Sequence, residues 1–182
     1  MKMLTLIFFL LAGITSEAKT MTKEIATLAG GCFWGMEELI RAIPGVLTTT
    51  VGYTGGDVEN PNYNVVKLGT TNHAEAVQVE FDPKILNFSD LLGYFFRMHD
   101  PTTLNQQGND KGTQYRSVIF YHSLVQQEKA KEVITSLEAA KKWPRPIVTK
   151  VIEATKFYPA EDYHQDYLKK NPGGYTCHWL RD

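Results

Sequence analysis

"EIATLAGGCFWGMEELIRAIPG", residues 24–45, decides how the fold begins, because it predicts a buried strand that runs directly into a helix. β-Branched and small apolar residues predict the strand over 25–29, and two glycines end it. In the helix that follows, apolar residues recur every three or four positions until a Pro-Gly pair stops the pattern. Cys32, one of only two cysteines in the chain, stands at the junction.

Strands and helices continue to alternate outward from this unit. Strands are predicted at 46–53, 74–81, 114–121 and 147–154, and helices at 87–100 and 123–143. Two long polar loops, 54–73 and 102–113, separate them, and residues 156–182 hold one helical candidate at 160–170 followed by an irregular tail.

This order of elements predicts an α/β (α+β) fold. It is a two-layer sandwich with a mixed, largely antiparallel sheet, built on a ferredoxin-like split βαβ core with additions and a coiled C-terminal tail. At 182 residues the chain is long enough for one domain that needs neither a disulfide nor a metal in order to fold.

Charge and composition narrow the choice of partners. A formal net charge of −1, with lysines spread along the chain, argues against a nucleic-acid partner and against an acidic membrane surface. The five histidines do not share close ligand spacing with the two cysteines, so no bound metal is expected.

The first residues resemble an export signal. Lys2, the apolar run 4–12 and the small residues that follow predict a signal peptide over 1–18, cleaved after Ala18. Cleavage leaves a single domain, residues 19–182, in the periplasm or outside the cell. The run is shorter than the roughly 20 residues that span a bilayer, so no stable membrane association is expected, and a retained interfacial anchor is the alternative. A monomer is the default.

Export makes the pair of cysteines the central question. In an oxidising compartment, Cys32 and Cys177 form either a permanent structural staple or a redox couple. At the start of a helix, free amide groups and the helix dipole favour an anion, which predicts a stabilised and nucleophilic thiolate at Cys32. The competing interpretation is a small buried side chain. A cysteine hydrolase with His73 or His164 as base is a further alternative.

Aromatic and acidic residues supply candidates for the rest of a site. Phe33 and Trp34 follow the thiol, and at least one is expected to line a pocket for an apolar group such as a methyl, although two core aromatics fit the pattern as well. Glu75 alternates with apolar residues on the face of its strand that carries Val77 and Val79. A buried carboxyl there would have a raised pKa and act as a general acid.

Three loop residues complete the candidates. Tyr63 lies on the first long loop, and Asp110 and Tyr115 lie on or directly after the second. An uncharged phenol can donate a hydrogen bond to a polar oxygen of a substrate. Taken singly, each tyrosine is more often a surface or half-buried residue.

Several segments together resemble the peptide methionine sulfoxide reductase A family. They are collinear over residues 24–179: "GGCFWG", "GYTGG", "PNYNVV", "HAEAVQVEF", "HDPT", "GNDKGTQYRSVIF", "FYPAEDYHQDYL" and "NPGGYTCH". One departure is Asn72, which stands where a glycine commonly precedes the HAE motif. No third cysteine is present to relay a disulfide outward.

The resemblance implies an oxidoreductase, a peptide-methionine (S)-S-oxide reductase that repairs oxidised methionine in proteins and acts on free methionine sulfoxide. Cys32 matches the nucleophile and Glu75 the proton donor. Tyr63 and Tyr115 match the residues that bind the sulfoxide oxygen. Phe33 and Trp34 match those that hold the methyl group, and Asp110 matches an aspartate that shapes the site.

The resemblance also implies how the reaction turns over. Attack by the nucleophile releases methionine and leaves Cys32 as a sulfenic acid. Cys177 matches the resolving cysteine, which forms a disulfide with Cys32, and Gly173 and Gly174 give its tail freedom to move. Thioredoxin or a thioredoxin-like donor then reduces the disulfide, and no bound cofactor is implied.

Overall fold

The computed structural model describes residues 22–182 of the chain. The predicted signal peptide, residues 1–18, and its cleavage site lie outside the described residues. Within 22–182, no helix combines the length and the apolar character needed to cross a membrane.

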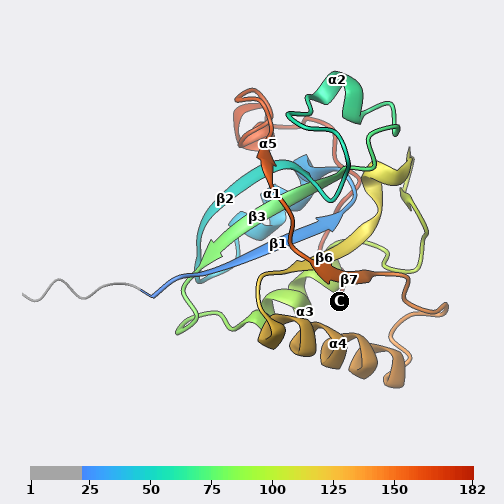
Figure 1. The fold of residues 1–182 in the computed structure, drawn as a ribbon. Helices are drawn as coiled ribbons and strands as arrows, with labels where there is room; N and C mark the ends of the chain where they lie inside the picture. The colour runs from blue at the N-terminus through green and yellow to red at the C-terminus, as the bar shows by residue number, and fades with distance from the viewer. Residues whose placement is uncertain (1–21) are drawn as a thin grey trace, which may run out of the picture.

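A six-stranded sheet forms the centre of the domain, in the order β7-β6-β1-β3-β2-β8 (Figure 1). Its strands are β1 Glu24–Gly30, β2 Val46–Thr54, β3 Ala74–Phe81, β6 Ser117–Tyr121, β7 Lys150–Glu153 and β8 Tyr158–Pro159. Every neighbouring pair is antiparallel except β6 and β7, which are parallel. The predicted mixed, largely antiparallel sheet is confirmed, and β6-β1-β3-β2 is the split βαβ order.

Three longer helices pack with this sheet: α1 Phe33–Arg41, α3 Phe88–Met98 and α4 Leu124–Ala139. In Figure 1, α1 lies behind the sheet and α4 runs below it beside α3. The main core lies between the sheet and these helices and includes the fully buried Leu28, Met36, Ile40, Leu92 and Phe95. The predicted apolar stripes of α1 and α3 therefore form the core face.

Polar side chains set where two of these helices begin. Asn87 accepts a hydrogen bond from the Asp90 amide (2.9 Å) at the start of α3, and Ser123 accepts one from the Gln126 amide (3.2 Å) at the start of α4. The predicted helix over 123–143 ends early, at Ala139, and Lys141 then adopts a left-handed φ of 49°.

The two long loops contain short elements that the sequence pattern did not predict. The first holds α2, Tyr63–Val66, capped by the Asn62 side chain. The second holds the hairpin β4 Gln106–Gln107 and β5 Asp110–Lys111, and then the 3₁₀ turn η1 Thr113–Tyr115. Elements this short carry no hydrophobic period, so periodicity could not detect them.

The predictions for the C-terminal part need correction. The strand predicted at 147–154 is limited to Lys150–Glu153, and the helix predicted at 160–170 is limited to α5, Tyr167–Lys170. A left-handed φ of 54° at Asp166 prevents an earlier start for α5. The buried carboxyl of Glu37 accepts a hydrogen bond from the Asp166 amide (2.9 Å), so a tertiary contact supports this conformation.

Asn72 shows how this chain accommodates its departure from the motif. Its backbone is left-handed, with φ at 56°, a region that glycine adopts freely and asparagine tolerates better than most residues. Its side-chain amide donates a hydrogen bond to Asp57 (2.6 Å) across the loop. The turn before β3 therefore forms without a glycine.

Candidate active site

A cavity of about 160 Å³ lies where β1 ends and α1 begins. Its walls are Cys32, Phe33, Trp34, Tyr63, Glu75, Asp110, Tyr115 and Tyr175. Every cavity residue predicted from the sequence is present, and Tyr175 is an addition. A larger cavity, about 670 Å³, lies elsewhere between α3 and the end of the chain and contains neither thiol.

Cys32 occupies the cap position before α1, with only 6% of its surface exposed. The turn needs Gly31, whose φ is 112° and whose missing Cβ would lie 2.7 Å from the Gln107 side chain. Burial and the nearby Glu75 carboxylate raise the pKa of the Cys32 thiol, while the Trp34 amide lowers it. The expectation of a stabilised thiolate is therefore wrong for the resting site, because desolvation outweighs the helix start.

Glu75 lies on the core-facing side of β3, as its alternation with apolar residues predicted, and only 2% of it is exposed. Its carboxylate accepts a hydrogen bond from the amide of Phe33 at the start of α1 (3.1 Å). Burial outweighs this bond and raises the pKa of Glu75 to about 8. The carboxyl is therefore mostly protonated at neutral pH and can donate a proton into the cavity.

Two phenols reach the same cavity from separate loops. Tyr63 starts α2, where its amide donates to Glu161 (2.9 Å), and Tyr115 ends the turn η1. Burial, followed by the charge of Glu75, raises the pKa of both phenols. Both hydroxyls therefore keep their protons and remain hydrogen-bond donors at physiological pH.

The aromatic wall is held by a neighbouring cluster. Phe33 is 1% exposed and belongs to the core as well as to the cavity, so both interpretations of this residue are confirmed. The indole N–H of Trp34 donates to Nδ1 of His164 (2.9 Å), and its ring stacks on Tyr167 at 3.8 Å between centroids. The indole therefore has a fixed orientation beside the sulfur.

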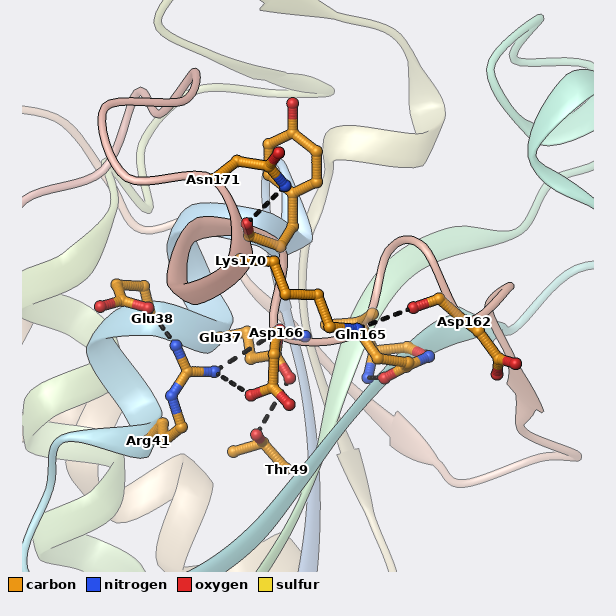
Figure 2. Close-up of polar contacts among 11 residues, drawn as sticks. Glu37, Glu38, Arg41, Thr49, Asp162, Gln165, Asp166, Lys170 and Asn171 are labelled. Carbon is orange, nitrogen blue, oxygen red and sulfur yellow. Dashed lines mark hydrogen bonds and ion pairs between the residues drawn. The ribbon is translucent and has the colours of Figure 1, made fainter.

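A polar network ties the segment before α5 to α1 (Figure 2). The buried carboxyl of Glu37 accepts bonds from the Thr49 hydroxyl (3.0 Å) and from the Asp166 amide (2.9 Å). Arg41 pairs with the Asp166 carboxylate at 2.8 Å. This network holds the segment that carries His164 against α1, the helix that follows Cys32.

The C-terminal tail forms the remaining side of the site. The Cys177 thiol donates to Asp110 Oδ2 (3.2 Å), and the backbone amide of Cys32 is near enough to the same sulfur to lower its pKa. The hydroxyl of Tyr175 donates to Asp110 Oδ1 (3.0 Å). Both cysteines are free thiols. Contacts in the fold thus bring together two cysteines that are far apart in sequence. Tyr175 was not predicted as a site residue, and its only signal in the sequence was its position near Cys177.

The predicted tail is irregular, yet it is docked. His178 is buried and its Nε2 lies 2.9 Å from the Gly30 carbonyl oxygen, while the Arg181 amide donates to Arg97 (2.9 Å). Gly35 allows this docking, because a Cβ there would collide with Thr176.

Neither histidine considered for a hydrolase contacts the thiol. His73 interacts through Nδ1 with the Gly56 amide (3.2 Å) and through Nε2 with the Val58 carbonyl (2.8 Å). His164 accepts from Trp34. Among residues 22–182, no group of three or more acidic, histidine or cysteine side chains could hold a metal ion.

Comparison with known proteins agrees with this geometry. A family model described as peptide methionine sulfoxide reductase matches residues 24–181. Peptide methionine sulfoxide reductase MsrA 1 of Mesorhizobium japonicum is 52% identical over 158 residues, covering 87% of this chain and 90% of that protein. The MsrA of Mycobacterium tuberculosis is 51% identical over 160 residues, covering 88% and 86%.

Solved structures show the same fold. Mxr1 of Saccharomyces cerevisiae in reduced form has a TM-score of 0.84 at 40% identity, over 93% of this chain and 98% of that one. Mxr1 in complex with Trx2 has a TM-score of 0.62 at 26% identity, over 93% and 97%.

Proposed function

The chain belongs to the peptide methionine sulfoxide reductase family, and on that basis we propose the roles of its cavity residues in the reduction of methionine S-sulfoxide. The protein is an oxidoreductase that acts on methionine sulfoxide. The observation that carries the proposal is one small cavity holding the Cys32 thiol, a protonated Glu75 and two phenol donors, with Cys177 at its edge.

In the first step, the sulfur of Cys32 attacks the sulfoxide sulfur while Glu75 protonates the sulfoxide oxygen. Tyr63 and Tyr115 donate hydrogen bonds to that oxygen as negative charge develops on it. Phe33 and Trp34 enclose the methyl group. The thiol proton replaces the one that Glu75 gives up, so the thiol and the sulfoxide become a sulfenic acid on Cys32 and the thioether of methionine.

The protonated state of Glu75 removes one of the causes that raise the pKa of the Cys32 thiol, although burial remains the largest. The Glu75 charge is one of the causes that oppose a thiolate at Cys32, and that charge is absent while Glu75 holds its proton. The carboxyl then loses its proton to the substrate oxygen in the same step that brings the thiol proton toward it. The acid and the nucleophile are therefore coupled by their contact in the cavity.

In the second step, Cys177 attacks the sulfenic sulfur of Cys32, which forms the disulfide and releases water. The position of both cysteines beside Asp110, which lines the cavity with Cys32 and accepts from the Cys177 thiol, supports this pairing. Gly173 has φ at 83° and open space around its Cβ position, which suits a hinge for the tail.

Thioredoxin or a thioredoxin-like protein is the proposed reductant of this disulfide. The solved complex of yeast Mxr1 with Trx2 supports that choice for a chain of the same fold. We also propose export, with cleavage after Ala18 and a single domain of residues 19–182, on the leader pattern described above. N-terminal sequencing of the mature protein tests it, and a start at Met1 contradicts it.

The test of function uses the reduced protein with each epimer of a methionine sulfoxide peptide. We expect catalytic conversion of the S epimer only into the methionine peptide, with thioredoxin and its reductase as the regenerating system. Cys32→Ser should abolish this conversion, and Cys177→Ser should convert about one equivalent and stop. Equal turnover of both epimers refutes the assignment, and full turnover by Cys177→Ser would indicate that the two cysteines are no redox couple.

A further inference from the structure

His178 is a buried histidine that the steps above leave without a role. It follows the resolving cysteine directly, and only 7% of it is exposed. Its Nε2 lies 2.9 Å from the carbonyl oxygen of Gly30, and its Nδ1 lies 3.5 Å from the sulfur of Cys177. The ring therefore contacts two parts of the site. One is the end of the strand that precedes Cys32, and the other is the Cys177 thiol, which must react with Cys32.

The Gly30 contact assigns the tautomer of the ring. A carbonyl oxygen only accepts hydrogen bonds, so Nε2 must carry the proton that it donates to Gly30. In the neutral ring, Nδ1 then presents its lone pair to the sulfur of Cys177. Burial lowers the pKa of His178, which keeps the ring neutral at physiological pH.

We propose that His178 is the general base that takes the proton from Cys177 in the second step. The Cys177 sulfur then forms a bond to the sulfur of Cys32, the S–O bond of the sulfenic acid breaks, and its hydroxyl leaves as water. Glu75 supplies the proton for that water, and the proton on His178 returns to Glu75 through solvent. The step thus converts a thiol and a sulfenic acid into a disulfide and one water, and it rests on the function proposed above.

A base is needed because the resolving thiol is strongly held in its protonated form. Burial and the hydrogen bond to Asp110 raise the pKa of Cys177 to about 12, so the free thiolate is scarce at neutral pH. The single thiol proton is donated to Asp110, at 3.2 Å, which also accepts from Tyr175, and rotation about the Cβ–Sγ bond turns it toward Nδ1 of His178, at 3.5 Å. An unperturbed imidazole is a stronger base than a carboxylate, and although burial weakens His178 as a base, Asp110 and the bond to Gly30 favour the ring once it has gained the thiol proton.

The charged and titratable groups around the ring are consistent with this role. Asp110 of β5 faces it and favours its protonated form, whereas Arg181 in the tail opposes that form. His99, after α3, and Cys177 are the other titratable neighbours. Burial has a larger effect on the pKa of His178 than either charge, so the ring is neutral before the step and releases the proton it gains.

The test is His178→Gln, because the side-chain amide of glutamine can still donate to Gly30 but offers no imidazole to the thiol. Reduced protein is mixed with one equivalent of S-sulfoxide peptide, and the methionine peptide formed (methionine release) and the remaining thiols are followed separately after rapid quenching. We expect methionine release at the wild-type rate, disulfide formation at least about tenfold slower at pH 7, and a sulfenic acid that dimedone traps. Trp179→Ala, an exposed neighbour, should leave both rates unchanged.

The pH dependence separates a base from a structural contact. Below the pKa of about 8 of Glu75, which protonates the leaving hydroxyl, the rate of the wild-type disulfide step should be level from pH 6.5 to pH 7.5. In His178→Gln the rate should rise about tenfold over the same pH unit as hydroxide removes the thiol proton. The proposal is overturned if His178→Gln forms the disulfide at the wild-type rate, or if its rate is lower than the wild-type rate by the same factor at every pH. It is also overturned, without any variant, if the rate of disulfide formation in the wild-type protein rises tenfold per pH unit. Absence of methionine release in the wild type would instead refute the reductase function.

Discussion

Replacing Glu75 with glutamine is expected to abolish efficient catalysis and, at the same time, to stabilise the folded protein at alkaline pH. The carboxyl has an ordinary pKa of 4.5 when free and a pKa of about 8 in the fold, where it is 2% exposed. The folded state therefore binds this proton more tightly than the unfolded state. The stability that depends on it is complete below the unfolded pKa and is lost as the pH rises through the folded pKa.

The magnitude follows from the pKa shift. One pKa unit corresponds to about 1.4 kcal/mol, so between pH 5 and pH 8 the ionisation of Glu75 lowers the free energy of unfolding by about 3 kcal/mol. Glutamine does not titrate, so Glu75→Gln should lack this loss. The assay is urea unfolding of the reduced proteins at both pH values. The change in the free energy of unfolding between the two pH values is measured for each protein, and the change in the variant is subtracted from the change in the wild type.

Glu80→Gln on the same strand is the matched control. Glu80 pairs with Lys23 at 2.7 Å near the solvent, and that bond lowers its pKa, so its removal should not alter the stability slope between pH 5 and pH 8. Parallel stability curves for the wild type and Glu75→Gln would refute the argument that burial keeps Glu75 protonated.

The same pKa governs the rate. General acid catalysis contributes about 10²- to 10⁴-fold, so Glu75→Gln should slow methionine release by that range in a single turnover. In the wild type, the rate of this step should fall about tenfold per pH unit above a pH near 8, because the ionised carboxylate has no proton to donate. A wild-type rate that is level up to pH 10 would show that another group supplies the proton.

Four further substitutions test other parts of the site. Gly35→Ala should slow disulfide formation more than methionine release in rapid-quench assays, because the added methyl displaces the tail at Thr176; equal slowing would contradict this. Tyr63→Phe and Tyr115→Phe should each lower kcat by about tenfold and the double variant by about 10²-fold or more, since two donors share one oxygen; a silent double variant would remove both from the mechanism. Trp34→Leu should raise KM more than it lowers kcat in steady-state assays, because the indole walls the substrate cavity.

Local patterns were sufficient for the main elements. The period of apolar residues placed α1 and α3, and the alternation along β3 placed Glu75 on the buried face, because each signal is repeated over several turns or residues. Short elements escaped prediction. α2 and the β4–β5 hairpin carry few residues each, and tertiary contacts rather than propensity hold them.

Some chemical features of the site were likewise predicted from the sequence, and others were not. The residue types and the motifs identified the thiol, the acid and the phenols, and all of them reach the cavity. The charge state of Cys32 was predicted wrongly, because a helix start is visible in the sequence while desolvation depends on everything packed around the thiol. Tyr175 was missed because a tail without periodicity gives no sign of where it docks.

The sequence by itself determined the family, the order of strands and helices and the candidates for the reacting groups, since these depend on residue types and local periods. The tertiary structure alone decided how these groups behave. Burial protonates Glu75, the docked tail brings Cys177 to Asp110, and the Gly30 carbonyl turns the lone pair of His178 toward that thiol. Solvation and the distance between residues far apart in the chain are properties of the packed molecule. The reactivity of Cys32 in "GGCFWG" therefore depends on contacts with residues that are distant in the sequence.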